Sequence, residues 1–195
     1  MKSLIMTKEI RRVEQRIVYQ TERSSIREDT IVYADGREEV HEILQSPEGV
    51  LILPITQDGR IMLTKEYRHN HGWVYGVPMG RKETGDSQPL DAAKRELKEE
   101  VGLAATKWTH ISTHHNGIHE EGLNYFYIAE VLTAGTFSHD KDEDIQSIEM
   151  TFEDAFRLMD KGEIVDLPSR GCIWAGYIHL QNKSKEKPSN TEKPR

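Results

Sequence analysis

Three glutamates lie close together on one predicted helix in the middle of the chain. Glu96 precedes Glu99 and Glu100 by three and four residues, so all three project from one helical face. Like charges at these spacings repel, and the arrangement is most favourable when a cation binds among the carboxylates. Carboxylate oxygens favour a hard divalent ion, Mg²⁺ or Mn²⁺. The alternative interpretation is a solvated acidic face that binds nothing.

The residues around the glutamates define the helix that carries them. Pro89 falls in its first turn, and Gly102 follows its last turn as a C-cap. Apolar residues recur at helical spacing on the other face, at Leu90, Ala93, Leu97 and Val101. The helix therefore has an apolar face to bury and an acidic face to present.

This segment resembles the Nudix box, Gly-x5-Glu-x7-Arg-Glu-U-x-Glu-Glu-x-Gly-U, where U is a bulky aliphatic residue. The half from Arg95 to Leu103 matches at every fixed position. In the half that begins at Gly80, Asp86 replaces the family's Glu, and eight residues rather than seven separate it from Arg95. The family's first Glu forms an ion pair or hydrogen bond near the Arg, and Asp is one methylene shorter. The resemblance assigns Arg95 a catalytic role.

The resemblance also implies a set of metal ligands. Glu96 and Glu100 are expected to bind the metal, and Glu99 acts as a third ligand or orients the other two. The family recruits a backbone carbonyl just before the box glycine, which here belongs to Met79. Such a site neutralises charge on phosphoryl oxygens and activates a water for in-line attack on a diphosphate.

A general base is expected in the acidic segment of residues 139–145, His-Asp-Lys-Asp-Glu-Asp-Ile. Related enzymes carry an acidic loop at this point, and the loop supplies the carboxylate base. Glu143 has the longest reach and lies closest to the family's acidic position, so we predict that it is the base. Asp142 and Asp144 are the alternatives, and a solvated turn is the interpretation without catalysis.

Cationic side chains near the box are candidates to bind a diphosphate. Arg68 is the leading one, because a Tyr-Arg pair at the end of this strand recurs in the ADP-ribose pyrophosphatase branch near the bound phosphates, and a guanidinium binds phosphate in a bidentate way. Arg81, Lys65 and Lys82 are weaker candidates. For Arg81 and Lys82 the alternative is ordinary solvated loop charge.

The histidine-rich segment 114–121 is predicted to contact substrate. His115 and His119 stand four apart, but Gly117 between them disfavours a continuous helix, and phosphate-bound metals prefer oxygen ligands. The ADP-ribose branch has Ser-Pro-Gly here followed by a Glu, whereas this chain lacks the proline. Glu120 or Glu121 is expected to supply the acidic contact. A histidine metal site is the less favoured interpretation.

Aromatic side chains are the usual platforms for a nucleobase. In relatives of this branch the N-terminal arm supplies the base-stacking residues, and Tyr19 is the leading candidate here. Tyr33 and Trp73 are further candidates, and each of the three has an alternative role in packing.

Composition limits the partners. The chain has 195 residues, with 33 acidic against 26 basic side chains and a net charge of -7, which disfavours an extended nucleic-acid footprint. The single cysteine, Cys172, excludes an internal disulfide and a cysteine-based zinc site. No signal peptide and no apolar run long enough to span a bilayer is recognisable, so cytoplasmic residence is expected.

The order of predicted elements indicates an α/β fold. The dipeptides Asp35-Gly36 and Asp58-Gly59 predict two hairpins. Strands are expected at 30–33, 38–44, 50–55, 61–67, 124–132 and 147–152, and helices after the box at 153–161 and 170–180. This order resembles the Nudix α/β/α sandwich, a mixed sheet covered by helices, preceded by an N-terminal β arm.

Three segments are expected. Residues 1–45 form the strand arm, residues 46–180 the Nudix hydrolase domain, and residues 181–195 a disordered tail rich in Lys, Ser, Asn and Pro. In the ADP-ribose pyrophosphatase branch such an arm builds an intertwined homodimer, so the resemblance implies a homodimer.

These features lead to one favoured function and several alternatives. We expect a Mg²⁺-dependent pyrophosphohydrolase of a nucleoside diphosphate sugar, with ADP-ribose cleaved to AMP and ribose 5-phosphate. GDP-mannose and dinucleoside polyphosphates are the alternative substrates. A sensor with the Nudix fold that binds such a ligand without cleaving it is the alternative from another class, and the intact glutamate cluster argues against it.

Overall fold

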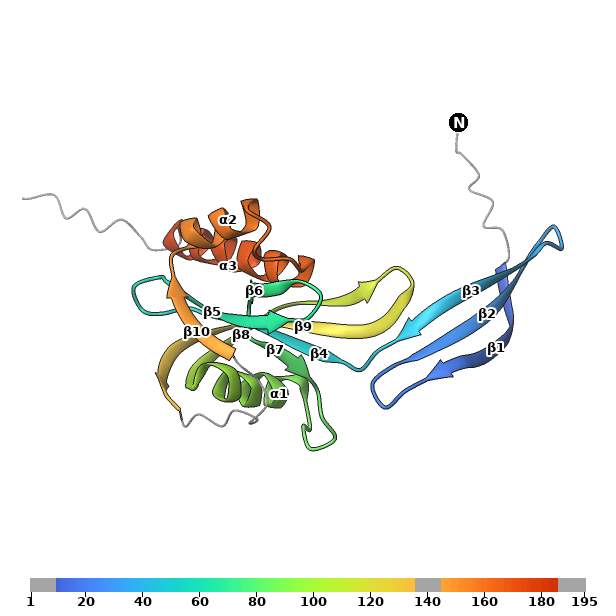
Figure 1. The fold of residues 1–195 in the computed structure, drawn as a ribbon, viewed down its shortest axis with the longest axis horizontal. Helices are drawn as coiled ribbons and strands as arrows, with labels where there is room; N and C mark the ends of the chain where they lie inside the picture. Colours follow the sequence, from blue (N-terminus) through green and yellow to red (C-terminus); the bar gives the residue numbers. More distant parts are fainter. Residues whose placement is uncertain (1–9, 136–144, 186–195) are drawn as a thin grey trace, which may run out of the picture. The chain divides into compact units, whose positions relative to one another are not determined.

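A computed structural model describes residues 10–135 and 145–185. The chain divides into two compact units, which are drawn in Figure 1. Unit 1 combines Met1–Glu48 with His114–Asn124, and unit 2 combines Gly49–Thr113 with Tyr125–Arg195. Within the described ranges, no helix has the length and apolar character needed to cross a membrane.

Unit 1 is built on an antiparallel meander of β1 (Ile10–Gln20), β2 (Ser25–Tyr33) and β3 (Glu38–Gln45). The predicted turn at Asp35-Gly36 is confirmed, and Gly36 has φ +82°, a conformation that glycine adopts without a steric cost. The end of β3 pairs in parallel with Glu120 and Glu121 at the start of β9 (Glu120–Ala134). The pattern predicted β2 and β3 but missed the long first strand.

The described residues of unit 2 contribute strands to two sheets and form three helices. In one sheet β4 (Gly49–Pro54) lies between β9 and β7 (Met79–Arg81), and β8 (Leu103–Gly117) pairs with β9. The other sheet has the order β10 (Ile145–Met150), β5 (Ile61–Arg68), β6 (Gly72–Gly76). The helices are α1 (Pro89–Glu96), which continues as a π turn, η1 (Leu97–Val101), then α2 (Phe152–Asp160) and α3 (Leu167–Lys185).

Strand β4 is buried along its whole length because helices cover both of its faces. Leu51 and Leu53 belong to a core cluster with residues of α2 and α3, whereas Val50 and Ile52 belong to a second cluster with residues of α1. Figure 1 shows α2 and α3 on one side of the strands and α1 on the other. The predicted α/β/α sandwich with a mixed sheet is confirmed, and its two clusters position the acidic helix against β4 and β7.

Two expectations about the chain's organisation need correction. The Asp58-Gly59 turn forms, but β4 and β5 enter different sheets and meet at an isolated bridge between Ile55 and Ile61. Helix α3 begins at Leu167 and runs to Lys185, so residues 181–185, which we expected in the disordered tail, are helical. Lys183 in this last turn forms an ion pair with Glu130 of β9, which stabilises the helix end. The remainder of the predicted tail lies outside the described residues.

Candidate active site

The acidic helix begins and ends as its sequence predicts. Gln88 is the extended N-cap and forms a capping box with Asp91, and Pro89 is the first helical residue. At the other end Gly102 adopts φ +70°, the left-handed conformation of a C-cap. Between them the helix widens into the π turn η1, a feature that is frequent at functional sites. Because Glu99 and Glu100 lie in this turn, their spacing from Glu96 departs from that of a regular α-helix.

Glu96 lies against the box glycine. Its side chain is buried, with 9% of the residue exposed. A Cβ atom placed on Gly80 would stand 1.9 Å from the Glu96 Oε1 atom and 2.0 Å from its carboxyl carbon. The carboxylate therefore occupies the space that any larger residue at position 80 would fill. Steric exclusion by Glu96 therefore explains why this position of the motif is a glycine.

Glu100 is tied to the strand that precedes the box. The backbone N–H of Met79 donates a hydrogen bond of 3.0 Å to the Glu100 Oε2 atom. Met79 is in turn fixed by β7, where it pairs with Leu51 of the buried strand β4. This bond places Glu100, a predicted metal ligand, beside the backbone of Met79, whose carbonyl is another predicted ligand.

Arg95 joins the parts of the box. Its Nη1 atom donates to Glu96 Oε1 at 2.8 Å and to Glu99 Oε2 at 2.9 Å. Its Nη2 atom donates to the backbone carbonyl of Arg81 at 2.8 Å and to Asp86 Oδ2 at 3.2 Å. Asp86 therefore reaches the arginine although it is shorter than the family's Glu. One guanidinium holds two of the glutamates and both ends of the preceding loop.

The electrostatics of the site favour a cation at Glu96. Burial of this side chain raises the pKa of its carboxyl to about 7, although the neighbouring Arg95 lowers it. A buried carboxylate of this kind ionises more readily when a cation approaches it. The donor chemistry of Glu96, Glu99 and Glu100 therefore fits a hard divalent ion.

The three glutamates do not form a preorganised metal cage. Among the residues that the structure describes, no three His, Cys, Asp or Glu side chains converge as a metal-binding group. Glu96 and Glu99 bind Arg95, and Glu100 binds the Met79 N–H. An incoming metal would need side-chain rotations within this cluster.

Arg68 lies on the face of its sheet that packs against the acidic helix. Met62 of β5 packs against the core cluster that contains Leu97, and alternation along the strand places Arg68 on the same side. There the Arg68 Nη2 atom donates to Glu66 Oε1 at 2.7 Å. Arg81 is exposed at the end of β7, directly beside the carbonyl that binds Arg95. Both arginines therefore lie on elements that border the glutamates.

Lys65 and Trp73 lie on the other side of the same sheet. Leu63, which alternates in phase with Lys65, belongs to the cluster of α2 and α3. The Lys65 ammonium group lies over the Trp73 ring, 5.4 Å from its centroid. These two candidates are therefore separated from the glutamates by the sheet, and in the structure they contact each other.

Tyr19, Glu120 and the histidine segment belong to unit 1. Tyr19 is exposed on β1. Glu120 accepts hydrogen bonds from Ser46 Oγ at 2.8 Å and Asn116 Nδ2 at 3.0 Å. Glu121 instead accepts two bonds from the buried Arg27 guanidinium, at 2.6 and 2.7 Å. Glu121 is engaged in an ion pair, so Glu120 is the better candidate for an acidic contact with substrate.

The histidine segment forms the tip of a hairpin. Strand β8 ends at Gly117 and β9 begins at Glu120, so His115 lies on a strand and His119 in the turn. Their spacing of four residues is therefore not a helical one.

The predicted base Glu143 and its alternatives Asp142 and Asp144 lie outside the described residues.

Comparison with known proteins identifies the class. The NUDIX domain family matches residues 45–168, more than half of the chain. The chain belongs to the Nudix family and is a Nudix hydrolase, a class that generally uses divalent metal ions. Within this family it falls in the branch of the ADP-ribose pyrophosphatases.

Three curated relatives and one solved structure are similar along most of the chain. Identity is 31% to the ADP-ribose pyrophosphatase of Bacillus subtilis (strain 168), covering 75% of this chain and 80% of that protein. It is 27% to the methanol dehydrogenase activator of Bacillus methanolicus, covering 82% and 86%. It is 24% to the ADP-ribose pyrophosphatase of Mycobacterium tuberculosis (strain ATCC 25618 / H37Rv), covering 86% and 83%. A crystal structure of an ADP compounds hydrolase has the same fold, with a TM-score of 0.80, 19% identity and coverage of 91% of this chain and 97% of that chain.

Proposed function

We propose that this Nudix hydrolase cleaves the diphosphate of ADP-ribose and releases AMP and ribose 5-phosphate, with Mg²⁺ or Mn²⁺ as its metal. The observation that carries the proposal is the Arg95 cluster, which gathers Glu96, Glu99 and the box loop beside Gly80. The similarity to two ADP-ribose pyrophosphatases supports the choice of substrate.

Each part of the cluster has a role in this proposal. Glu96, Glu99 and Glu100, with the Met79 carbonyl, would hold the metal, which when bound supplies positive charge to the phosphoryl oxygens and acidifies a water. Arg95 orients Glu96 and Glu99 through its two short bonds. Arg68 and Arg81 bind the diphosphate, Glu120 supplies an acidic contact, and Tyr19 stacks on the adenine.

Glu143 is proposed as the general base that takes the proton from the attacking water. If so, Glu143→Gln lowers kcat by about a hundredfold or more and leaves the affinity for Mg²⁺ nearly unchanged. Glu96→Gln, in contrast, weakens both. Steady-state kinetics over a Mg²⁺ titration separates these patterns. A larger loss in Asp142→Asn or Asp144→Asn would move the role to that residue.

Selectivity for ADP-ribose is expected to be modest. The segment His115-Asn116-Gly117 lacks the proline of the ADP-ribose branch, and a stacking platform accepts either purine. We expect kcat/KM for ADP-ribose to exceed that for other nucleoside diphosphate sugars by about tenfold, equivalent to about 1.4 kcal/mol. The measurement compares ADP-ribose, ADP-glucose, GDP-mannose and diadenosine diphosphate. A hundredfold preference for GDP-mannose would assign the enzyme to that substrate.

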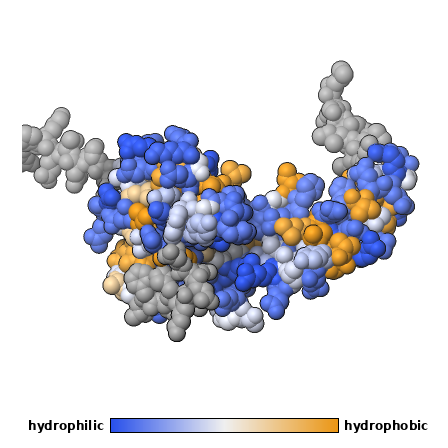
Figure 2. Space-filling model, viewed as in Figure 1, coloured by the Kyte–Doolittle hydropathy of each residue, from blue (hydrophilic) through white to orange (hydrophobic). Residues whose placement is uncertain are grey.

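A homodimer built through the N-terminal arm, residues 1–45, is the proposed assembly. Apolar side chains of β1 and β3 are exposed in unit 1, among them Ile10, Val13, Ile17, Val40 and Leu44. Figure 2 shows hydrophobic surface over these strands. The strand register places Ile10 and Ile17 on one face of the meander and Val40 and Leu44 on the other. Exposed apolar side chains of this kind are typical of a subunit interface.

The double variant Val13→Glu with Ile17→Glu is expected to be monomeric at micromolar concentration, because it places charge in the proposed interface. Sedimentation or light scattering measures the mass. Arg23→Glu, in the exposed turn after β1, is the control and should remain dimeric. A monomeric wild-type chain at the same concentration would refute the assembly.

A further inference from the structure

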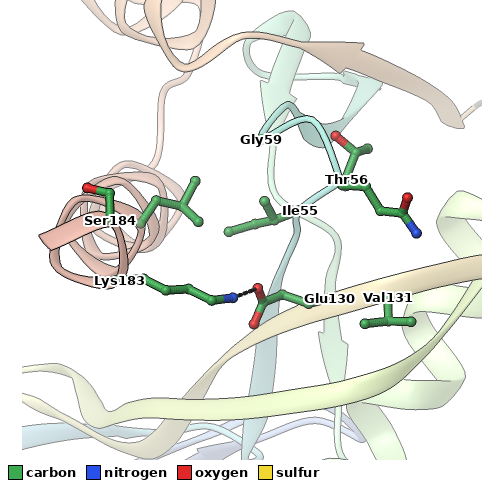
Figure 3. A pocket seen from close by; sticks show the side chains of 9 residues that line it. Ile55, Thr56, Gly59, Glu130, Val131, Lys183 and Ser184 are labelled. Carbon is green, nitrogen blue, oxygen red and sulfur yellow. Dashed lines mark hydrogen bonds and ion pairs between the residues drawn. The ribbon is translucent and has the colours of Figure 1, made fainter. Parts of the chain in front are cut away.

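A cavity lies on the α3 side of the sheet in unit 2. Its volume is about 330 Å³, at the lower end of the range for pockets that hold small molecules. Figure 3 shows it between the turn after β4, strand β9 and the end of α3. Its lining residues are Ile55, Thr56, Gln57, Gly59, Glu130, Val131, Leu180, Lys183 and Ser184. None of these belongs to the glutamate cluster, which α1 carries against the opposite face of β4.

Two cationic side chains surround Glu130 in the wall of this cavity, Lys183 from the lining and Lys107 from outside it. The buried Glu130 carboxylate binds two ammonium groups, Lys107 Nζ at Oε2 and Lys183 Nζ at Oε1, each at 2.5 Å. His179 adds a ring nitrogen 4.0 Å from Glu130 Oε2, and this buried atom has no hydrogen-bond partner within the described residues. Two lysines around one carboxylate leave a net positive charge in a chain whose overall charge is -7.

The wall of the cavity contains a backbone outlier. Val131 has φ +56°, and it is the one residue other than glycine with a positive φ among those the structure describes. A β-branched residue is strained in this conformation, and such strain is concentrated at functional sites. The strained residue directly follows Glu130, so the same short segment places the carboxylate and shapes the wall.

From these observations we propose that the cavity binds a compact organic anion, such as a sugar monophosphate. Lys183 is the anion-binding group, because Lys107 still neutralises Glu130 when Lys183 turns toward a ligand. The apolar side chains of Ile55, Val131 and Leu180 would contact the carbon body of the ligand. The inference concerns binding and does not depend on the proposed function.

The test uses calorimetric titration of the full-length protein in EDTA, which prevents turnover and removes metal from the catalytic site. Three probes separate the anion contact from the apolar contact: ribose 5-phosphate, inorganic phosphate, and ribose. We expect ribose 5-phosphate to bind at least about tenfold more tightly than either fragment, because it alone engages both the ammonium group and the apolar wall.

Two variants locate the binding. Ser184→Trp fills the cavity from an exposed position and leaves the Glu130 ion pairs intact, and Lys183→Met removes the anion-binding group. Each is expected to weaken the binding of ribose 5-phosphate at least about tenfold. Lys185→Trp, on the next exposed residue, is the control and should bind as the wild type does. The proposal would be overturned if the wild type binds no ribose 5-phosphate at about 10 mM, the weakest affinity of interest. It would also be overturned if Ser184→Trp leaves the binding unchanged.

Discussion

Glu100→Gln is expected to lower kcat by at least about a hundredfold and to leave the fold intact. The substitution replaces a carboxylate with a neutral amide on a partly exposed helix surface and removes no core packing. The amide oxygen can still accept the Met79 N–H bond, so the link between the helix and β7 is kept. The loss therefore reports the charge that Glu100 contributes to metal binding. Steady-state kinetics at saturating Mg²⁺ provides the measurement.

Glu153→Gln is the matched control, because Glu153 is an exposed glutamate in the first turn of α2, away from the cluster. It should retain the wild-type kcat. Circular dichroism of both variants checks that the helices remain. An unchanged kcat in Glu100→Gln would remove Glu100 from the metal site.

Gly80→Ala is expected to reduce kcat by about a hundredfold with a small effect on stability. The new methyl group would stand 1.9 Å from Glu96 Oε1, so the carboxylate must rotate away. That end of the side chain is flexible, and its movement costs the fold little. A displacement of about 1 Å in a catalytic group is sufficient for a loss of this size.

Gly85→Ala is the control for this variant, because a Cβ at Gly85 meets no atom within 4 Å. Kinetics and thermal unfolding of the two variants are compared side by side. Wild-type kcat in Gly80→Ala would show that the position of Glu96 beside Gly80 is not required. An equal loss in Gly85→Ala would indicate a general effect on the loop.

Local patterns predicted the helix and its ends correctly. Pro89 and Gly102 occupy the first helical position and the C-cap because their own conformational preferences suit those positions. The same is true of the Asp35-Gly36 turn, where Gly36 takes a positive φ. Each of these features depends on residues close together in the chain.

Features that depend on distant contacts could not be read from the sequence. The approach of Glu96 to Gly80 and the bond from the Met79 N–H to Glu100 form when β7 packs beside the helix. The π turn has no signature in the spacing of the glutamates, which fits a regular α-helix equally well. The partition of β4 and β5 into two sheets likewise depends on pairing with strands that are distant in the chain, β9 for β4 and β10 for β5.

Composition was a poor guide to the end of α3. Residues 181–185 are polar and resemble a solvated tail, yet they complete the helix. The partner that holds them is Glu130, more than fifty residues earlier in the chain. A buried acidic residue in a strand and a lysine in a polar segment give no sequence signal that they will meet.

Product analysis after incubation with ADP-ribose is the measurement that tests the central claim most directly. The purified chain is incubated with ADP-ribose and Mg²⁺, and the products are separated by ion-exchange chromatography. We predict equal amounts of AMP and ribose 5-phosphate, with their formation abolished by EDTA and reduced at least about a hundredfold in Glu100→Gln. Intact ADP-ribose after prolonged incubation with Mg²⁺ and with Mn²⁺, or cleavage that persists in EDTA, would contradict the account.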